Sequence, residues 1–288
     1  RKDIFDKYKI KPPKNFDELF QVCETLKDDK EIESPIAWPA KRGQPLATSF
    51  ILAMANYGKP YINLRHIGQN IYDLDSEKIL LKTNFLSEAS FQAAKMLKKL
   101  LNYSPKNISF HSNDECVEYY SKGKSAMVMN WSSRAHLFEL NNKSPAFKKT
   151  GYLPRPAGHP SFQVSPIGGF SLGVPKNIPN EKIPFIMKNI RNFVSPEFIK
   201  YYIEHGSLSS PVFSVVNDPE VRALSPIFNE IDKMEKEEKL IEWARYPLPT
   251  YSDIIEEVGN KIYEFIFLNK DLKDTLESCQ QSCQKYLN

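Results

Sequence analysis

The sequence predicts an α/β fold that is rich in helix. Three observations support this prediction: apolar residues mostly recur at helical spacing, the strand candidates are few and short, and helices separate those strands along the chain. The 288 residues, of which 41% are hydrophobic and 26% charged, can form one large domain or two lobes with a substantial core. The longest candidate apolar run, residues 50–55, is far shorter than the ~20 residues that span a bilayer.

In the first half of the chain, capping residues and glycines mark the ends of the predicted helices. These helices cover residues 15–26, 46–57, 87–101 and 112–123. Ser112 and Glu115 have the spacing of a capping box, and Asn15 with Glu18 has a similar spacing. The helix that ends before Gly58 is apolar almost all round, which predicts that it is buried.

The second half begins with a compact strand candidate, residues 125–130, which Trp131 follows. The predicted helices after it cover residues 183–193 and 196–205, and two long amphipathic helices fill residues 251–288 with a break near Asn269. Asn177 or Asn180 is the candidate cap of the first, and Ser195 is the cap of the second because a proline follows it at the first helical position.

Residues 169–173 match G-x-S-x-G, the nucleophile elbow of serine hydrolases, with Ser171 at the position of the nucleophile. An elbow needs a helix directly after the serine, and Pro175 is incompatible with a helix there. His205 is the only histidine that follows Ser171. Apolar alternation instead predicts an extended run over residues 167–174. A hydrolase is therefore the disfavoured alternative, and we expect no catalytic residue.

The sequence offers no recognisable metal or cofactor site. Its five histidines have no ligand spacing, and the glycine patterns that bind dinucleotides or phosphates are missing. Cys279 and Cys283 share one helical face, which favours packing over metal binding. Lysines alternate with acidic residues, as in 232–239, and this mixture argues against a nucleic-acid partner. We expect neither a metal nor a cofactor.

Aromatic side chains and glycines are concentrated near the ends of predicted strands. Trp131 follows an apolar strand, and Gly168 and Gly169 expose backbone beside Phe170. Arg245 lies in another segment rich in aromatic residues and proline. Flat rings cover the apolar C–H faces of sugars, while arginine and amide groups bind hydroxyls. These residues therefore indicate a site for a small polar ligand.

The ordered motifs of the chain resemble those of the family 1 extracellular solute-binding proteins. These are the sugar-binding components of bacterial ABC importers and are related to maltose-binding protein. The segments that carry the resemblance are RKDIF with PPKNFDE (residues 1–18), YSKGKSAMVMNW (120–131), GYLPRP with GGFSLGVP (151–175), VSPEF (194–198), NDPEV (217–221) and RYPLPTY (245–251). The resemblance extends over essentially the whole chain.

This resemblance implies a two-lobed periplasmic-binding-protein clamp that closes by hinge motion. Residues 1–165 and 209–288 would form the second lobe, and residues 166–208 would return to the first. By the same mapping, this sequence would lack the family segment that builds most of the first lobe. The implied ligand-binding residues are Trp131, Gly168, Gly169, Phe170, Arg245, Tyr251, Gln44 and Thr48, with Trp131 as the stacking ring and Gly168, Gly169 and Phe170 at the cleft and hinge.

The expected function is extracytoplasmic binding of a di- or oligosaccharide for delivery to the membrane subunits of an ABC importer. The protein would be a monomer, either periplasmic or anchored to the outer face of a membrane. Two alternatives stay open besides the hydrolase: binding of glycerol phosphate or another polyol, which a basic cluster around Arg134 and Arg245 favours, and a truncated remnant without ligand affinity.

Overall fold

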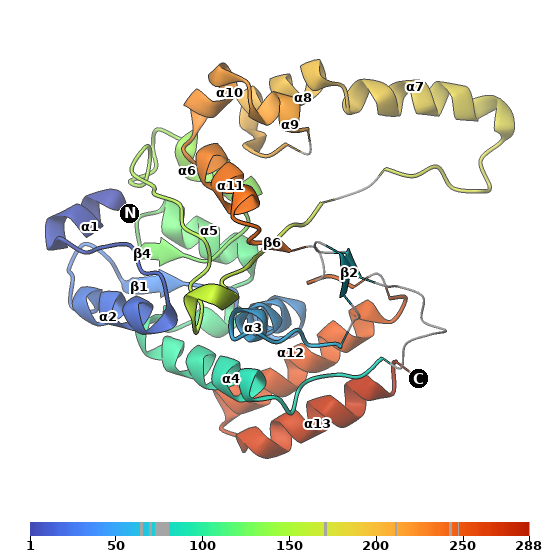
Figure 1. Cartoon of the computed structure of the whole chain (residues 1–288). Helices are drawn as coiled ribbons and strands as arrows, with labels where there is room; N and C mark the ends of the chain where they lie inside the picture. Colours follow the sequence, from blue (N-terminus) through green and yellow to red (C-terminus); the bar gives the residue numbers. More distant parts are fainter. Residues whose placement is uncertain are drawn as a thin grey trace.

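The computed structural model describes residues 1–63, 66–68, 71–72, 81–169, 172–210, 212–241, 244–246 and 248–287. Figure 1 shows its helices packed around short strands. The helices are α1 (Lys2–Tyr8), α2 (Phe16–Leu26), α3 (Gln44–Asn56), α4 (Glu88–Leu100), α5 (Asn113–Ser121), α6 (His136–Glu139), α7 (Ile183–Phe193), α8 (Pro196–Tyr202), α9 (Phe213–Val216), α10 (Pro219–Leu224), α11 (Ile227–Lys236), α12 (Tyr251–Leu268) and α13 (Leu272–Gln284). The strands are β1 (Ser34–Ala37), β2 (His66–Gly68), β3 (Ile71–Tyr72), β4 (Ser125–Val128), β5 (Ser165–Pro166) and β6 (Leu240–Ile241).

Most of the predicted helices are confirmed, together with several of their caps. Asn15 accepts a hydrogen bond from the amide of Glu18 at 2.8 Å, and the capping box of Ser112 and Glu115 is present. The predicted break between the last two helices lies at Asn269, which has a φ of 57°. Two predictions are wrong. The N-cap of α7 is Lys182 rather than an asparagine, because a 3₁₀ turn precedes the helix.

The second error concerns the extended run predicted over residues 167–174. The strand there is β5, Ser165–Pro166, and the described residues beyond it are not in a sheet. β5 pairs in parallel with β6, so that Ile167 still donates its amide to the carbonyl of Ile241 at 2.8 Å. Apolar alternation indicates an extended backbone, but a strand also needs a partner of matching length.

The strands that matter for the site form two parallel pairs. β1 lies beside β4, with Ser34 opposite Ser125 and Ala37 opposite Val128, and β5 lies beside β6. Every residue of β1 is buried, as expected for a strand covered on both faces. In a parallel pair both strands end at the same edge, so the residues that follow β1 and β4 leave the sheet together.

The main core lies around α3, which packs against α4 and α12 (Figure 1). Trp38 and Phe50 are fully buried in it, and Trp38 donates its indole N–H to Ser104 at 2.8 Å. α3 approaches α12 closely at Gly43 and Gly259, where no side chain separates the two backbones. The four cysteines are free thiols and are all buried, which confirms that Cys279 and Cys283 pack on a helix face.

A second apolar cluster joins segments that are distant in the sequence. Tyr120 of α5 and Phe138 of α6 pack there with Ile199 of α8, and Phe228 of α11 completes the cluster. The rings of Tyr120 and Phe138 meet edge to face, with 5.0 Å between their centroids. The α8–α11 segment is therefore attached to α5 and α6 through buried apolar side chains.

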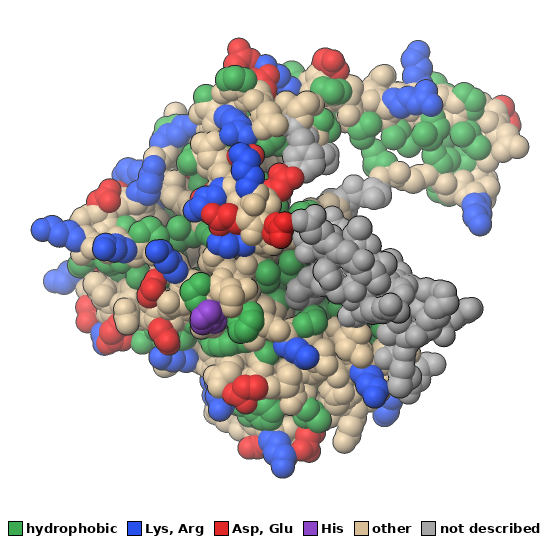
Figure 2. Space-filling model, in the orientation of Figure 1, with side chains coloured by type: hydrophobic (Ala, Val, Ile, Leu, Met, Phe, Trp, Pro, Cys, Tyr) green, Lys and Arg blue, Asp and Glu red, His purple; other side chains and the backbone are tan. Residues whose placement is uncertain are grey.

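Helix α7 extends away from this body at the upper right of Figure 1. None of its residues is buried, and Phe185 and Phe193 are 71% and 52% exposed. Figure 2 shows hydrophobic side chains gathered along this helix. Among the described residues, no helix has both the length and the apolar character that would let it cross a membrane.

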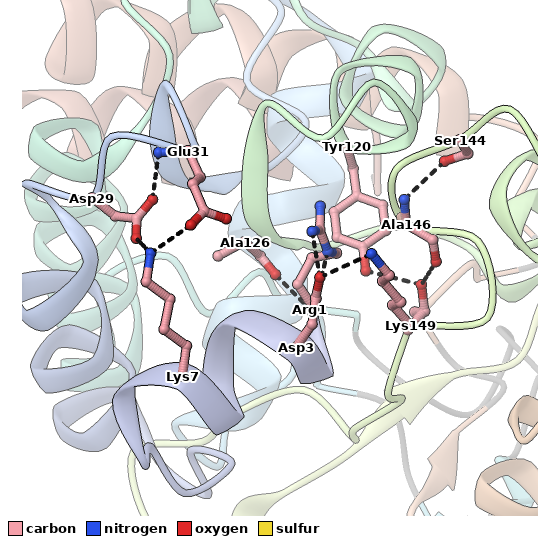
Figure 3. A network of polar contacts seen from close by, with 11 residues as sticks. Arg1, Asp3, Lys7, Asp29, Glu31, Tyr120, Ala126, Ser144, Ala146 and Lys149 are labelled. Atoms are coloured by element: carbon pink, nitrogen blue, oxygen red, sulfur yellow. Dashed lines mark hydrogen bonds and ion pairs between the residues drawn. The ribbon is translucent and has the colours of Figure 1, made fainter.

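Charged contacts attach α1 to the rest of the chain (Figure 3). Lys7 binds the carboxylates of Asp29 at 2.9 Å and Glu31 at 2.7 Å. Asp3 binds the guanidinium of Arg1 at 2.6 Å and also faces Lys149 at 3.5 Å. The side chain of Asp29 is completely buried, so removing one of its partners would destabilise the fold more than breaking a surface pair.

Candidate functional site

A large open cleft, about 1790 Å³ in volume, includes residues at the carboxyl ends of both parallel strand pairs. Pro39 follows β1 and Met129 follows β4, and Gly168 follows β5. Loops at this edge of α/β sheets are where ligands bind, because the strands end there together and leave a crevice. The position of the cleft makes it the candidate binding site.

Trp131 lines this cleft, and the side chain of Asn130 holds its backbone. The segment after β4 continues the ladder, since the amide of Met129 donates to the carbonyl of Ala37 at 2.9 Å. Oδ1 of Asn130 accepts a hydrogen bond from the backbone amide of Trp131 at 2.8 Å. Nδ2 of Asn130 donates one to the backbone carbonyl of Asn113 at 2.6 Å. The indole ring is half-buried and lines the cleft.

Two of the other predicted residues meet the Trp131 ring. The guanidinium of Arg245 lies over it, with 5.1 Å between Cζ and the ring centroid. The backbone of Gly168 lies against its edge, so that a Cβ at this position would be 3.2 Å from Cζ3. Gly169 also lines the cleft but is exposed, with no atom within 4 Å of where its Cβ would lie. Strand ends thus bring Trp131, Gly168 and Arg245 together.

Of the remaining predicted residues that the structure describes, one lines the cleft and two do not. Thr48 is half-buried on α3 and lines the cleft. Tyr251 begins α12 and is not part of the lining; burial raises the pKa of its hydroxyl, and the positive charge of Arg245 opposes that rise. Gln44 begins α3 and is exposed outside the lining. Phe170 lies outside the described residues.

The sequence argument did not select Arg155, which also lines the cleft. One of its guanidinium nitrogens lies 3.6 Å from Sδ of Met129, and burial lowers the pKa of the guanidinium to about 10. The only available signal was its position between Pro154 and Pro156, which restrict the backbone on both sides.

The disfavoured hydrolase hypothesis needs Ser171 and His205, of which the structure describes only the histidine. Ser171 lies outside the described residues. His205 faces the carbonyl of Tyr201 at 2.7 Å through Nδ1, and its ring stacks on that tyrosine at 4.0 Å. In the part of the chain that the structure describes, no group of three or more histidine, cysteine or acidic residues could hold a metal ion.

Comparison with known proteins decides the family. The model of the bacterial extracellular solute-binding proteins matches residues 1–200. The chain belongs to this family. The helix-rich α/β fold is that of its two-lobed members, which confirms the predicted fold class.

Solved structures of solute-binding proteins match nearly the whole chain at low sequence identity. A ribitol complex of an ABC transporter solute-binding protein from Agrobacterium radiobacter K84 has a TM-score of 0.84 and 18% identity, over 99% of this chain and 67% of that one. Maltose-bound MalE3 of T. maritima has a TM-score of 0.83 and 19% identity, over 100% and 69%. UgpB of Mycobacterium tuberculosis, in complex with glycerophosphocholine, has a TM-score of 0.71 and 15% identity, over 99% and 67%. About a third of each matched chain has no counterpart here.

Proposed function

We propose that this solute-binding protein binds a sugar or polyol in the cleft and delivers it to the membrane subunits of an ABC importer. The observation that carries the proposal is the Trp131 ring, which is half-buried in the cleft between Gly168 and Arg245. A rigid indole offers apolar surface to the C–H groups of a sugar, while the arginine and nearby backbone donate hydrogen bonds to its hydroxyls.

The similar structures support this class of ligand. The proteins from A. radiobacter and T. maritima hold ribitol and maltose, both of which are rich in hydroxyl groups. Their low identity leaves the particular solute open, so the proposal names a class. The family also supports a site of action outside the cytoplasm, either in a periplasm or on an anchored protein.

We further propose that the lobes divide the chain as the motifs suggest. Residues 1–165 and 209–288 would form one lobe, and 166–208 would cross to the other, with Gly168 and Gly169 at the hinge. The exposed apolar side chains of α7 support the crossing. Ile199 and Ile203 pack with Tyr120 and Phe138, so the last part of this crossing segment would lie against the lobe that residues 1–165 help to form.

Calorimetric titration with maltose, ribitol and mannitol tests the proposal, with tryptophan fluorescence as a second signal. At least one of these solutes should bind saturably. Trp131→Ala should weaken its binding by about 30-fold, which corresponds to the ~2 kcal/mol typical of a buried aromatic contact. Phe110→Ala is the matched control, because Phe110 is 74% exposed and does not line the cleft.

The result that would overturn the proposal also tests the hydrolase alternative. If no neutral or charged sugar or polyol bound, and an esterase activity disappeared in Ser171→Ala, the protein would be an enzyme. Equal loss of affinity in Trp131→Ala and Phe110→Ala would instead show that the effect is not local to the cleft.

A further inference from the structure

Arg155 is a cleft arginine without an acidic partner among the described residues. Within the described ranges, no carboxylate forms an ion pair with its guanidinium, which instead lies 3.6 Å from Sδ of Met129. The side chain is half-buried, and loss of water lowers its pKa to about 10. Proteins bury charges at a cost of several kcal/mol and normally offset it with a counter-ion.

Hydrogen bonds hold the backbone of Arg155 in place, so its side chain extends from a fixed point of the cleft wall. Its amide donates to Oγ of Ser165 at 3.4 Å, and its carbonyl accepts from Gln163 at 3.0 Å. Prolines on either side restrict the chain further. A guanidinium on such a rigid support is already oriented before a ligand arrives.

A second arginine lies on the adjacent part of the same wall. Arg155 contacts Met129 and Arg245 covers Trp131, two residues further along the segment that continues β4. No described carboxylate pairs with Arg245 either, whereas Arg134 is paired with Asp114 at 2.7 Å. The carboxylates among the described lining residues belong to other segments: Asp6 lies on α1, Glu230 and Glu235 lie on α11, and Glu238 follows α11.

Free backbone donors lie next to the Trp131 ring that Arg245 covers. In the part of the chain that the structure describes, the amide groups of Gly168 and Gly169 donate no hydrogen bond. Both glycines line the cleft, and Gly168 touches Trp131. Arginine forks and unpaired amides are the donors that bind phosphate and carboxylate oxygens.

We propose that Arg155 and Arg245, with the amides of Gly168 and Gly169, form an anion-binding subsite, and that the solute is a sugar or polyol bearing a phosphate or carboxylate group. This inference rests on the proposed function and narrows it. The ligand supplies the negative charge that the cleft wall lacks, while the Trp131 ring contacts its carbon skeleton. The same cation pair accepts either oxyanion, because both offer two coplanar oxygens to a guanidinium.

The test uses calorimetry to compare pairs of ligands that differ by one anionic group on a similar carbon skeleton. Ribitol 5-phosphate is compared with ribitol, and gluconate with sorbitol, and inorganic phosphate is titrated alone. One charged member should bind about 10- to 100-fold more tightly than its neutral partner, and this preference should shrink as sodium chloride is raised. The better of the two pairs identifies phosphate or carboxylate as the preferred group.

Variants then assign the preference to Arg155. Arg155→Met should lose the preference for the charged ligand, and Arg155→Lys should keep part of this preference. Arg191→Met, on exposed α7, is the control and should bind the charged ligand as the wild type does. Arg155→Met should also unfold at the same or a higher temperature without ligand, because it removes an uncompensated charge and leaves the backbone hydrogen bonds in place. A structural role for Arg155 would lower that temperature.

The outcomes separate this inference from the proposed function. If ribitol or maltose bound as tightly as the charged ligands, and Arg155→Met bound them unchanged, the anion subsite would be wrong and sugar binding would stand. If charged ligands were preferred equally by wild type and Arg155→Met, the subsite would also be overturned. If nothing bound, both proposals would fail.

Discussion

The guanidinium of Arg245 lies over the indole ring of Trp131, with 5.1 Å between Cζ and the ring centroid. The two residues are far apart in sequence and meet because each follows a parallel strand, β4 or β6, at its carboxyl end. The contact therefore links the end of the first parallel strand pair to the end of the second.

A double-mutant cycle should detect this contact directly. Trp131→Leu and Arg245→Met each remove one partner, and their free energies of unfolding should be coupled by about 0.5–1 kcal/mol, the usual range for an exposed cation–π pair. Urea denaturation of the wild type, the two single variants and the double variant supplies the four values. Effects that add to within about 0.3 kcal/mol would show that the two side chains do not interact in solution.

Gly168 and Gly169 should differ in their tolerance of a methyl group. In Gly168→Ala the new Cβ would lie 3.2 Å from Cζ3 of Trp131, so the ring must move by a few tenths of an ångström. In Gly169→Ala the methyl group meets open space. We expect solute affinity to fall several-fold in the first variant and to stay unchanged in the second, by calorimetry. Near-ultraviolet circular dichroism should change in the first only; equal behaviour of both variants would contradict the contact.

The sequence was a good guide where local chemistry determines structure. Caps at Asn15, Ser112 and Ser195 marked helix starts correctly, because a cap depends on residues within one turn. Trp131 was identifiable as a cleft residue since it follows an apolar strand and precedes a polar turn. Fold class followed from the order of the elements, and the ordered motifs identified the family.

Long-range relationships were harder to predict. The length of β5 depends on β6, which lies more than seventy residues later in the chain, and no local pattern contains that partner. Arg155 is similar: its lowered pKa results from burial near Met129, whereas its own neighbours in sequence give only a restrained backbone. The sequence therefore did not reveal which distant segments pair, or which side chains this pairing removes from water.

Gly259 should be among the least replaceable residues of the core. A Cβ there would lie 2.0 Å from the carbonyl oxygen of Gly43, and Gly43 has a φ of 87° and cannot easily move. Gly259→Ala must therefore separate α12 from α3, and we expect it to lower the free energy of unfolding by roughly 2–3 kcal/mol or more. Lys261 lies on the same helix and forms a long ion pair with Glu257, with 3.7 Å between the charged atoms. Lys261→Ala should therefore change the free energy of unfolding by less than about 0.5 kcal/mol. Urea denaturation compares the two, and equal effects would exclude tight packing at Gly259.

Asp29 should give the protein part of its sensitivity to acid. Burial alone would raise the pKa of this carboxyl, but hydrogen bonds from Tyr8 at 2.6 Å, Lys7 at 2.9 Å and the amide of Glu31 at 2.6 Å outweigh burial and lower it. Because the folded pKa lies below the unfolded value of about 3.9, the unfolded chain takes up the proton more readily. This contribution to stability is present above the unfolded pKa and is lost as the pH falls through the folded one.

Asp29→Asn should therefore lower the free energy of unfolding at pH 7 by roughly 1–2 kcal/mol, and the loss relative to wild type should shrink between about pH 5 and pH 2. Asp28→Asn is the matched control, because Asp28 is the adjacent residue and is exposed. Urea denaturation at a series of pH values measures both variants. If the free energy of unfolding fell equally steeply with decreasing pH in the wild type and in Asp29→Asn, Lys7 and Tyr8 would not hold this carboxylate in solution. The control should keep the full wild-type slope, because no buried hydrogen bond is lost with it.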